Sequence, residues 1–534
     1  MEHLRNDHTS VLIDASAGCP RIAYWGVALN PGEPHDQLAA ASSMPLVHGS
    51  VDDAAPLSVL PELSTGYPGQ PGLLGARVDG NAWAPRLSLD SVDASTESAT
   101  YVCTDPIAGI EVEIRIDLGD ALTIAVSLTN NGASDYALHA LTPTLPVPPT
   151  AVELLQLGGR WAHEFQLHRQ PWQHGVLESA SHRGRTSHDR VPLVFVGTSG
   201  FSEQRGEVWG AHLAWSGNHR WRAEVLSDGR RCLQIGEFLL PGEVVLAPGE
   251  CYRAPVVVAV HSPSGLVGAS AAFHRVARAH TVAPKTPRPV TLNTWEALYF
   301  DHDQQRLFEL VREAARCGVE RFVLDDGWFS SRRNDTSGLG DWWVSEDVYP
   351  GGLNPLIDHV HQLGMQFGLW VEPEMVNRDS QLFRSHPDWV LSTQGYDAPE
   401  ARNQLVLDLS RPDTFAYIES CLDSLLDNHH IDYLKWDMNR DHVQGSDARG
   451  RAATRRQVLA LYRLMEGLRR RHPGVEIESC SSGGGRIDFG ILQHCERVWA
   501  SDCNDALERQ HIQRALSLFV PHRTRAITHD RSTS

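Results

Sequence analysis

Residues 432–440, DYLKWDMNR, place two charged residues inside a short apolar segment. Lys435 and Asp437 are two residues apart, so on a strand they point to the same face. A strand buried on both faces of a parallel sheet is normally an almost unbroken apolar run, and buried charges are unfavourable unless they are paired or used. The segment therefore predicts either a buried ion pair that closes a strand or a functional carboxylate beside a lysine.

Carboxylates and tryptophans also mark the ends of other apolar segments. The acids are Glu296, Asp325, Asp326, Glu372, Glu374, Asp437, Asp502 and Asp505, and the tryptophans are Trp295, Trp328, Trp370, Trp436 and Trp499. Sugar C–H faces pack on aromatic rings, and charged groups bind hydroxyls strongly. Tryptophans that only fill the core would explain two or three of the five. Glycoside hydrolysis needs two carboxyl groups, and this pattern supplies candidates without choosing a pair.

The second half of the chain alternates between predicted strands and helices. Strands are predicted at 291–300, 321–329, 367–374, 433–440, 476–485 and 498–505, and helices at 303–317, 353–363, 412–430 and 455–472. Repeated βα units favour a parallel sheet, and acids at the strand ends favour a TIM-type (β/α)8 barrel. A doubly wound sheet would carry an early Gly-rich phosphate turn, which the sequence lacks.

The first half has a different pattern. Short alternating segments at 111–119, 122–132, 192–199 and 253–262 predict a β-sandwich. A helix is predicted at 264–281, and a Pro-rich linker follows at 282–291. The predicted domains are therefore 1–283, a β-sandwich, and 284–534, a barrel domain.

Composition narrows the class of partner. The net charge of −19 argues against nucleic acid or an anionic membrane as a partner. Nine scattered cysteines without a CxxC pair are typical of reduced thiols. The N-terminus lacks a signal-peptide pattern, and no apolar run approaches the length of a membrane span. We expect a cytoplasmic protein.

A resemblance to a known family rests on several motifs. LDDGWF, GLWVEPEM, KWDMNR, ESCSSGGGR and WASDCNDALER, in this order and spacing, resemble those of the microbial α-galactosidases of glycoside hydrolase family 36. The resemblance implies a β-supersandwich followed by a barrel. It also implies a retaining exo-α-galactosidase that acts on terminal α-D-galactosyl residues of oligosaccharides such as melibiose and raffinose, without a cofactor, in a possible homotetramer.

The resemblance also assigns residues. It makes Asp437 the nucleophile and Asp502 the acid/base. The positions that it places around the sugar are Trp295, Asp325, Asp326, Trp370, Arg402, Lys435 and Trp499, with Cys480 and Gly483 leaving room at the 2-hydroxyl. The local chemistry agrees, because Lys435 would keep Asp437 ionised and the apolar neighbours of Asp502 would raise its pKa.

After residues 519–521 the sequence departs from the family pattern, in which two further barrel strands and a C-terminal β-domain follow. We therefore expect an incomplete barrel of about six strands, with weak or no activity and poor solubility. The alternative functions are an α-N-acetylgalactosaminidase or galactosyl transferase of the same fold, or a non-catalytic sugar-binding remnant. Cys480 and Gly483 favour the galactosidase.

Other chemical patterns are weak, and we expect no metal site. The Asp325-Asp326 pair lacks a histidine or a third spaced acid, and the Gly-rich 481–485 lacks the Lys-Ser/Thr of a phosphate loop. His359 and His361 fall in a helical pattern, where residues two apart face different sides. Cys480 has no histidine nearby in sequence that could activate it.

Overall fold

The computed structural model describes residues 1–30, 33–43, 51–52, 55–284 and 286–526, and the chain divides into two compact units. Unit 1 comprises Met1–Gly158, Leu167–His182 and Arg190–Ala279. Unit 2 comprises Gly159–Gln166, Arg183–Asp189 and His280–Ser534. The proposed domain boundary at residues 283 and 284 lies just after helix α2 (Gly265–His280). Two short segments from the first half of the chain thus belong to unit 2.

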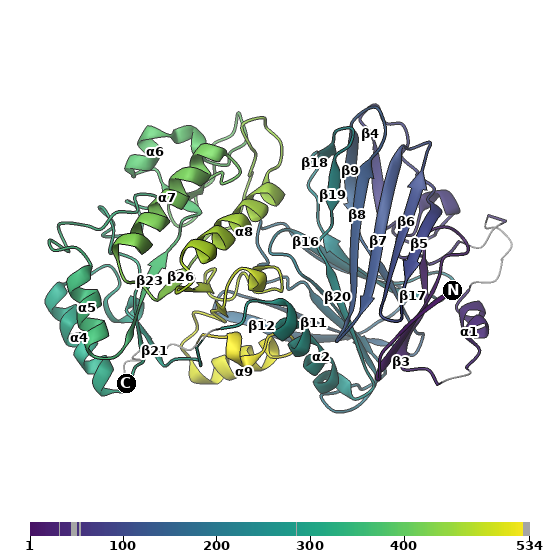
Figure 1. Ribbon diagram of the computed structural model, residues 1–534, viewed down its shortest axis with the longest axis horizontal. Helices are drawn as coiled ribbons and strands as arrows, with labels where there is room; N and C mark the ends of the chain where they lie inside the picture. The colour runs from purple at the N-terminus through teal and green to yellow at the C-terminus, as the bar shows by residue number, and fades with distance from the viewer. Residues whose placement is uncertain (31–32, 44–50, 53–54, 285, 527–534) are drawn as a thin grey trace. The chain divides into compact units, whose positions relative to one another are not determined.

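Unit 1 is built from antiparallel sheets, and several of its strands bury every second residue. In β7 (Ile110–Leu118) the isoleucines and valine are buried and the acids and arginine between them are not. The largest sheet has the order β12-β11-β14-β15-β20-β8-β7-β6-β5, and its central strands lie side by side in Figure 1. Its other strands are β5 (Ser88–Ala94), β6 (Ser98–Asp105), β8 (Leu122–Asn130), β11 (Glu153–Arg160), β12 (His163–Pro171), β14 (Leu193–Gly197), β15 (Val208–Leu213) and β20 (Val257–Ser262), with β19 (Cys251–Arg253) paired to β8.

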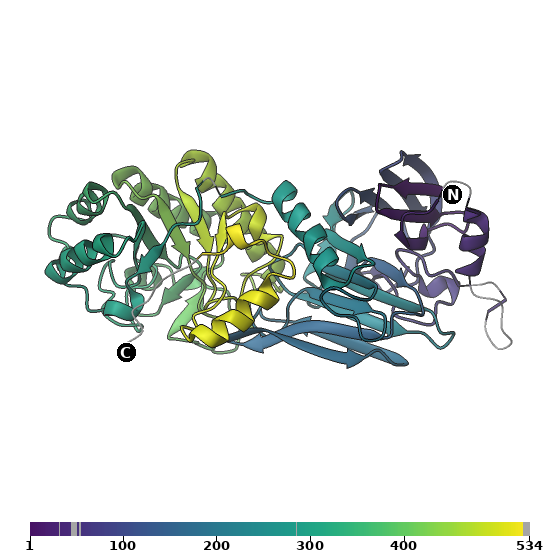
Figure 2. The ribbon, with the colours of Figure 1, turned by 90° about the horizontal axis from the view of Figure 1, so that it is seen from below.

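Smaller sheets complete unit 1. They consist of β1 (Glu2–Arg5), β2 (Thr9–Asp14) and β3 (Arg21–Val27); of β10 (Thr144–Val147), β17 (Arg231–Glu237), β16 (His219–Val225) and β13 (Gly175–Ser181); and of β18 (Val244–Leu246), β9 (Tyr136–Leu141) and β4 (Leu73–Arg77). Helix α1 (His35–Ala41) packs on β2 and β3, as Figure 2 shows. The predicted N-terminal β-domain is confirmed.

Unit 2 contains a six-stranded parallel sheet whose strands follow one another in chain order. They are β21 (Thr291–Asn293), β22 (Arg321–Leu324), β23 (Gln366–Val371), β26 (Tyr433–Trp436), β27 (Glu476–Ser479) and β28 (Arg497–Val498). The helices are α4 (Gln304–Arg316), α5 (Asn354–Gln362), α6 (Gln381–Ser385), α7 (Pro412–Asn428), α8 (Thr454–Arg471) and α9 (Ala506–Leu516). Helix α4 packs on α5 and α7 on α8 (Figure 1). None of the helices in the described part of the chain is long and apolar enough to cross a membrane.

Several predicted strands are too long. The segment 291–300 is a strand only to Asn293, and the short helix α3 (Trp295–Leu298) follows. The strands predicted at 367–374, 476–485 and 498–505 end at Val371, Ser479 and Val498. Beyond these points the chain turns, and β24 (Met375–Asn377) pairs antiparallel with β25 (Gln404–Val406). Trp370 and Trp436 lie in strands as predicted, whereas most of the acidic residues taken for strand positions lie beyond the carboxyl ends of the strands.

A buried ion network joins the opposite, amino ends of the strands. Arg321, Glu476 and Arg497 are the first residues of β22, β27 and β28. The carboxylate of Glu476 lies 2.7 Å from the guanidinium of Arg321 and 3.1 Å from that of Arg497. Burial acts to raise the pKa of Glu476, but the hydrogen bonds and charges of the two arginines outweigh it and lower the pKa. One carboxylate therefore ties three strands together.

We predict that Glu476→Gln lowers the stability of the protein by about 3–5 kcal/mol, because two buried guanidinium groups lose their counter-ion. Thermal melting near neutral pH measures the loss. The matched control is Glu419→Gln, which removes the half-exposed pair with Arg471 and should change stability by less than about 1 kcal/mol. Equal melting temperatures for the two variants would contradict the structural role of Glu476.

Candidate active site

A cavity of about 660 Å³ opens at the carboxyl ends of the parallel strands in unit 2. Its volume is within the range of small-molecule sites. Its lining residues are Trp161, Ala162, Arg185, His188, Asn293, Trp295, Glu296, Asp325, Asp326, Trp370, Arg402, Lys435, Asp437, Asn439, Ser482, Trp499, Asp502 and Asn504. All of the predicted site residues except Cys480 and Gly483 are in this set. Both stand within two residues of Ser482, which does line the cavity.

Asp437 follows β26 directly, and four donors hold its carboxylate. Oδ1 accepts from the backbone amides of Met438 (2.8 Å) and Ser482 (3.1 Å). Oδ2 accepts from Nε1 of Trp370 (3.1 Å) and Nδ2 of Asn439 (2.7 Å). Burial alone would raise the pKa of Asp437, but the charges of Lys435 and Arg402 and the Asn439 hydrogen bond lower it below its ordinary value. The group is a fixed, ionised carboxylate.

Lys435 supplies the buried positive charge beside it. Its Nζ lies 2.9 Å from Oδ2 of Asp325, which follows β22, and β23 lies between that strand and β26 in the sheet. Burial acts to lower the pKa of Lys435, but the nearby carboxylates, with Asp325 the strongest, raise it well above its ordinary value. Lys435 and Asp437 both line the open cavity. They therefore do more than close a strand as a buried ion pair, which was the structural alternative for this segment.

Asp502 lies in the loop after β28, and two indoles bind it. Nε1 of Trp499 donates to Oδ1 at 2.9 Å, and Nε1 of Trp161 donates to Oδ2 at 2.8 Å. Burial raises the pKa of Asp502, and the negative charge of Asp437 adds to the rise, against the lowering effects of Lys435 and both indoles. The two acids of one cavity thus have pKa values shifted in opposite directions.

The turn after β27 must pass close to Asp502. Gly483 has φ of +76°, and a Cβ there would lie 2.7 Å from Oε1 of Glu164 and 2.8 Å from the amide nitrogen of Asp502. Only glycine suits this position. Oε2 of Glu164 accepts from the Ser501 hydroxyl at 2.5 Å, and burial raises the pKa of Glu164 to about 7. Cys480 packs with Trp499 and Ala526, and burial raises the pKa of its thiol, which suits a packing residue.

Asp325 and Asp326 are fixed by separate partners. Asp325 accepts from Nδ2 of Asn293 at 2.5 Å, in addition to its ion pair with Lys435. Asp326 accepts two hydrogen bonds from the buried guanidinium of Arg332, at 3.0 and 2.8 Å. Two adjacent carboxylates are stable here because each has its own cation. Glu372 and Glu374, in contrast, are buried outside the cavity lining, where they bind Gln404 and Arg486.

Sequence patterns missed several lining residues. Trp161, Ala162, Arg185 and His188 come from the two segments of the first half that belong to unit 2, and nothing in their local sequence marks them. Asn439 and Ser482 stand inside the quoted motifs and could have been included. Positive φ at Ala162, Arg402 and Ser482 (58°, 53° and 46°) shows backbone strain around the cavity, a common property of functional sites.

Comparisons with known proteins agree with this geometry. The family model described as Melibiase matches residues 251–533, and the glycosyl hydrolase family 36 N-terminal domain matches residues 18–247. The chain belongs to glycoside hydrolase family 36. It is 45% identical to an Escherichia coli α-galactosidase over 94% of this chain and 71% of that protein. It is 38% identical to the α-galactosidase AgaA of Geobacillus stearothermophilus over 80% of this chain and 60% of that protein.

Solved structures extend the similarity. A crystal structure of AgaA from Geobacillus stearothermophilus has a TM-score of 0.91, with 32% identity over 98% of this chain and 78% of that chain. An AgaA variant in complex with raffinose has a TM-score of 0.92, with 31% identity over the same shares. The family resemblance and the glycoside hydrolase class predicted from the motifs are confirmed.

The indole of Trp161 offers a test of the site's electrostatics. Its hydrogen bond to the carboxylate lowers the pKa of Asp502, so Trp161→Phe should raise that pKa, because the ionised form loses a donor. The basic limb of the kcat/KM profile for an α-galactoside should therefore move to higher pH. Trp83→Phe, an exposed tryptophan of unit 1, is the control. An unmoved limb would contradict the assigned contact.

Proposed function

We propose that the chain is a retaining, exo-acting α-galactosidase with Asp437 as nucleophile and Asp502 as acid/base. The observation that carries this proposal is the opposite pKa shift of the two carboxyl groups that share one cavity. Glycosidases need one ionised and one protonated carboxyl group on either side of the scissile bond. Asp437 has the properties of the first and Asp502 those of the second.

In the first step Oδ of Asp437 attacks the anomeric carbon of the galactosyl residue, and Asp502 gives its proton to the departing glycosidic oxygen. The C–O bond to the leaving group breaks as the bond to Asp437 forms. In the second step Asp502, now ionised, takes a proton from water, whose oxygen attacks the same carbon and releases Asp437. Two displacements at one carbon give net retention. The donors of Met438, Ser482 and Asn439 keep the nucleophile in place throughout.

The proposed substrates are α-galactosyl oligosaccharides of the raffinose type. Asp325 and Asp326 present carboxylate oxygens to the cavity, and sugar hydroxyls are donors that can satisfy them. Trp295, Trp370 and Trp499 give aromatic walls for the apolar faces of the ring. AgaA variants have been crystallised with raffinose and with stachyose, which supports the same substrate class here. Cys480 and Gly483 are proposed to shape the wall at the 2-hydroxyl through Ser482.

We also infer that the six parallel strands form part of a TIM-type barrel. Sequential parallel order and acids at the carboxyl ends of the strands support this architecture. In the described residues β21 and β28 are the two ends of the sheet order, and Arg525 makes a parallel bridge to Val498 on the outer side of β28. The chain therefore continues the sheet beyond the sixth strand, by at least this bridge.

Removal of the nucleophile should stop turnover. We predict that Asp437→Asn lowers kcat for raffinose by more than about a thousandfold, because an amide cannot form the glycosyl ester. Release of galactose measures the effect, and melting temperature checks the fold. The control Asp427→Asn changes an exposed aspartate of α7 and should keep wild-type kcat. Substantial hydrolysis by the Asp437 variant would exclude this residue as nucleophile.

Removal of the acid/base should depend on the leaving group. We predict that Asp502→Ala lowers kcat/KM for raffinose by roughly 10²–10⁴-fold. With a nitrophenyl α-galactoside, whose leaving group needs no proton, the loss should be far smaller, and added azide should increase the rate. Equal losses on both substrates without azide rescue would overturn the role of Asp502 but leave that of Asp437 untouched.

A further inference from the structure

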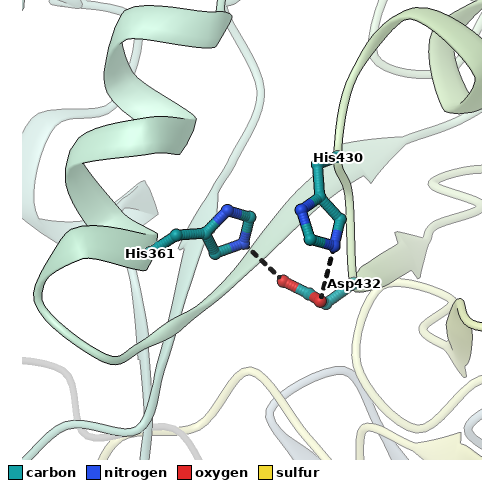
Figure 3. Close-up of side chains that lie close together, drawn as sticks. All are labelled: His361, His430 and Asp432. Atoms are coloured by element: carbon teal, nitrogen blue, oxygen red, sulfur yellow. Dashed lines mark hydrogen bonds and ion pairs between the residues drawn. The ribbon is translucent and has the colours of Figure 1, made fainter.

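Two histidines and an aspartate converge on the surface of unit 2, away from the sugar cavity. His361 is in the last turn of α5, His430 follows α7, and Asp432 precedes β26. One ligand atom from each residue lies within 4.8 Å of the others. Nε2 of His361 is 2.9 Å from Oδ2 of Asp432, and Nε2 of His430 is 3.8 Å from Oδ1. Figure 3 shows both rings pointing a nitrogen at the carboxylate.

The carboxylate at the centre of this group is held firmly by the sheet. The amide of Asp432 donates to the carbonyl of Phe367, and its own carbonyl accepts from the amide of Glu476. Its Oδ2 accepts from the amide of Phe367 at 2.8 Å, which fixes the side chain and leaves Oδ1 toward His430. Asp432 is thus fixed between β23 and β27, and a ligand group with this support is pre-organised.

We propose that His361, His430 and Asp432 form a binding site for a divalent transition-metal ion of the Zn²⁺ class. Imidazole nitrogens suit zinc, nickel and copper, whereas magnesium and calcium prefer oxygen ligands. A tetrahedral zinc site with bonds of about 2.0–2.2 Å places its ligand atoms roughly 3.3–3.6 Å apart. The separations of 2.9 Å from His361 to Oδ2 and 3.8 Å from His430 to Oδ1 lie on either side of this value.

Three protein ligands leave the fourth position of a tetrahedral ion for water. Water can reach the ion, because the side chain of His430 is 78% exposed. The site lies at the other end of β26 from the proposed nucleophile, because Asp432 precedes this strand and Asp437 follows it. At about 3.3 Å per residue the two aspartates are roughly 16 Å apart. The ion would bridge α5 and the segment between α7 and β26. We expect the ion to stabilise the contact between these two segments and to take no part in sugar hydrolysis.

Isothermal titration of EDTA-treated protein with ZnCl₂ tests the proposal. Wild-type protein should show a high-affinity site of one ion per chain and a higher melting temperature with zinc than without it. His430→Gln should weaken this affinity at least tenfold, because even supporting partners of metal ligands contribute roughly 10–100-fold. His430 is exposed, so the variant's melting temperature without zinc should match the wild type.

His429→Gln is the matched control, since the neighbouring ring of His429 binds Asn354 at 2.7 Å and is outside the group. It should keep the wild-type affinity for zinc. Anomalous diffraction from zinc-soaked crystals should place the ion among His361, His430 and Asp432. No high-affinity site, an affinity that His430→Gln leaves unchanged, or an ion located elsewhere on the chain would overturn the proposal.

Discussion

The candidate active site depends on the interactions of the buried ammonium group of Lys435 with the carboxylates around it. It contacts Asp325, and the charges of Asp437 and Asp502 also act on it. An isolated buried charge is strongly unfavourable, whereas a well-paired one can hold its neighbours in place. One cation cannot neutralise three carboxylates, so the pKa values of the two acids shift apart. Burial acts to raise the pKa of Asp437, but the charges of Lys435 and Arg402 and its hydrogen bonds lower it, whereas burial and the charge of Asp437 raise the pKa of Asp502.

The site is completed by residues from far away in the sequence. Arg185, in one of the two first-half segments of unit 2, donates to the carbonyls of Met438 (2.8 Å) and Ser481 (3.1 Å) and pairs with Asp441. It therefore joins the loop that carries Asp437 to the turn that carries Gly483. Trp161, from the other segment, binds Asp502. These contacts place both proposed catalytic carboxyl groups under the control of segments that precede the parallel sheet by more than a hundred residues.

Much of this arrangement could be predicted from the sequence. Charged residues interrupting apolar runs located Asp325, Lys435 and Asp437, because a buried strand end tolerates such residues only when they have partners. The alternation of apolar and polar residues predicted the β-domain, and the alternation of strands and helices predicted the parallel sheet. The strand bounds were less accurate, since tryptophans and acids in the loops resemble strand residues. Trp161 and Glu164 were not predictable, because tertiary contacts alone define their roles. The same is true of His361, His430 and Asp432, which only the fold brings together.

In the proposed mechanism Asp437 forms the covalent bond to the sugar. Incubation with a fluorinated galactoside that traps the glycosyl-enzyme, followed by proteolysis and mass spectrometry, identifies the labelled residue directly. We predict a single label on Asp437, in the peptide that contains residues 432–440. A label on Asp502, or on any residue outside that segment, would contradict it.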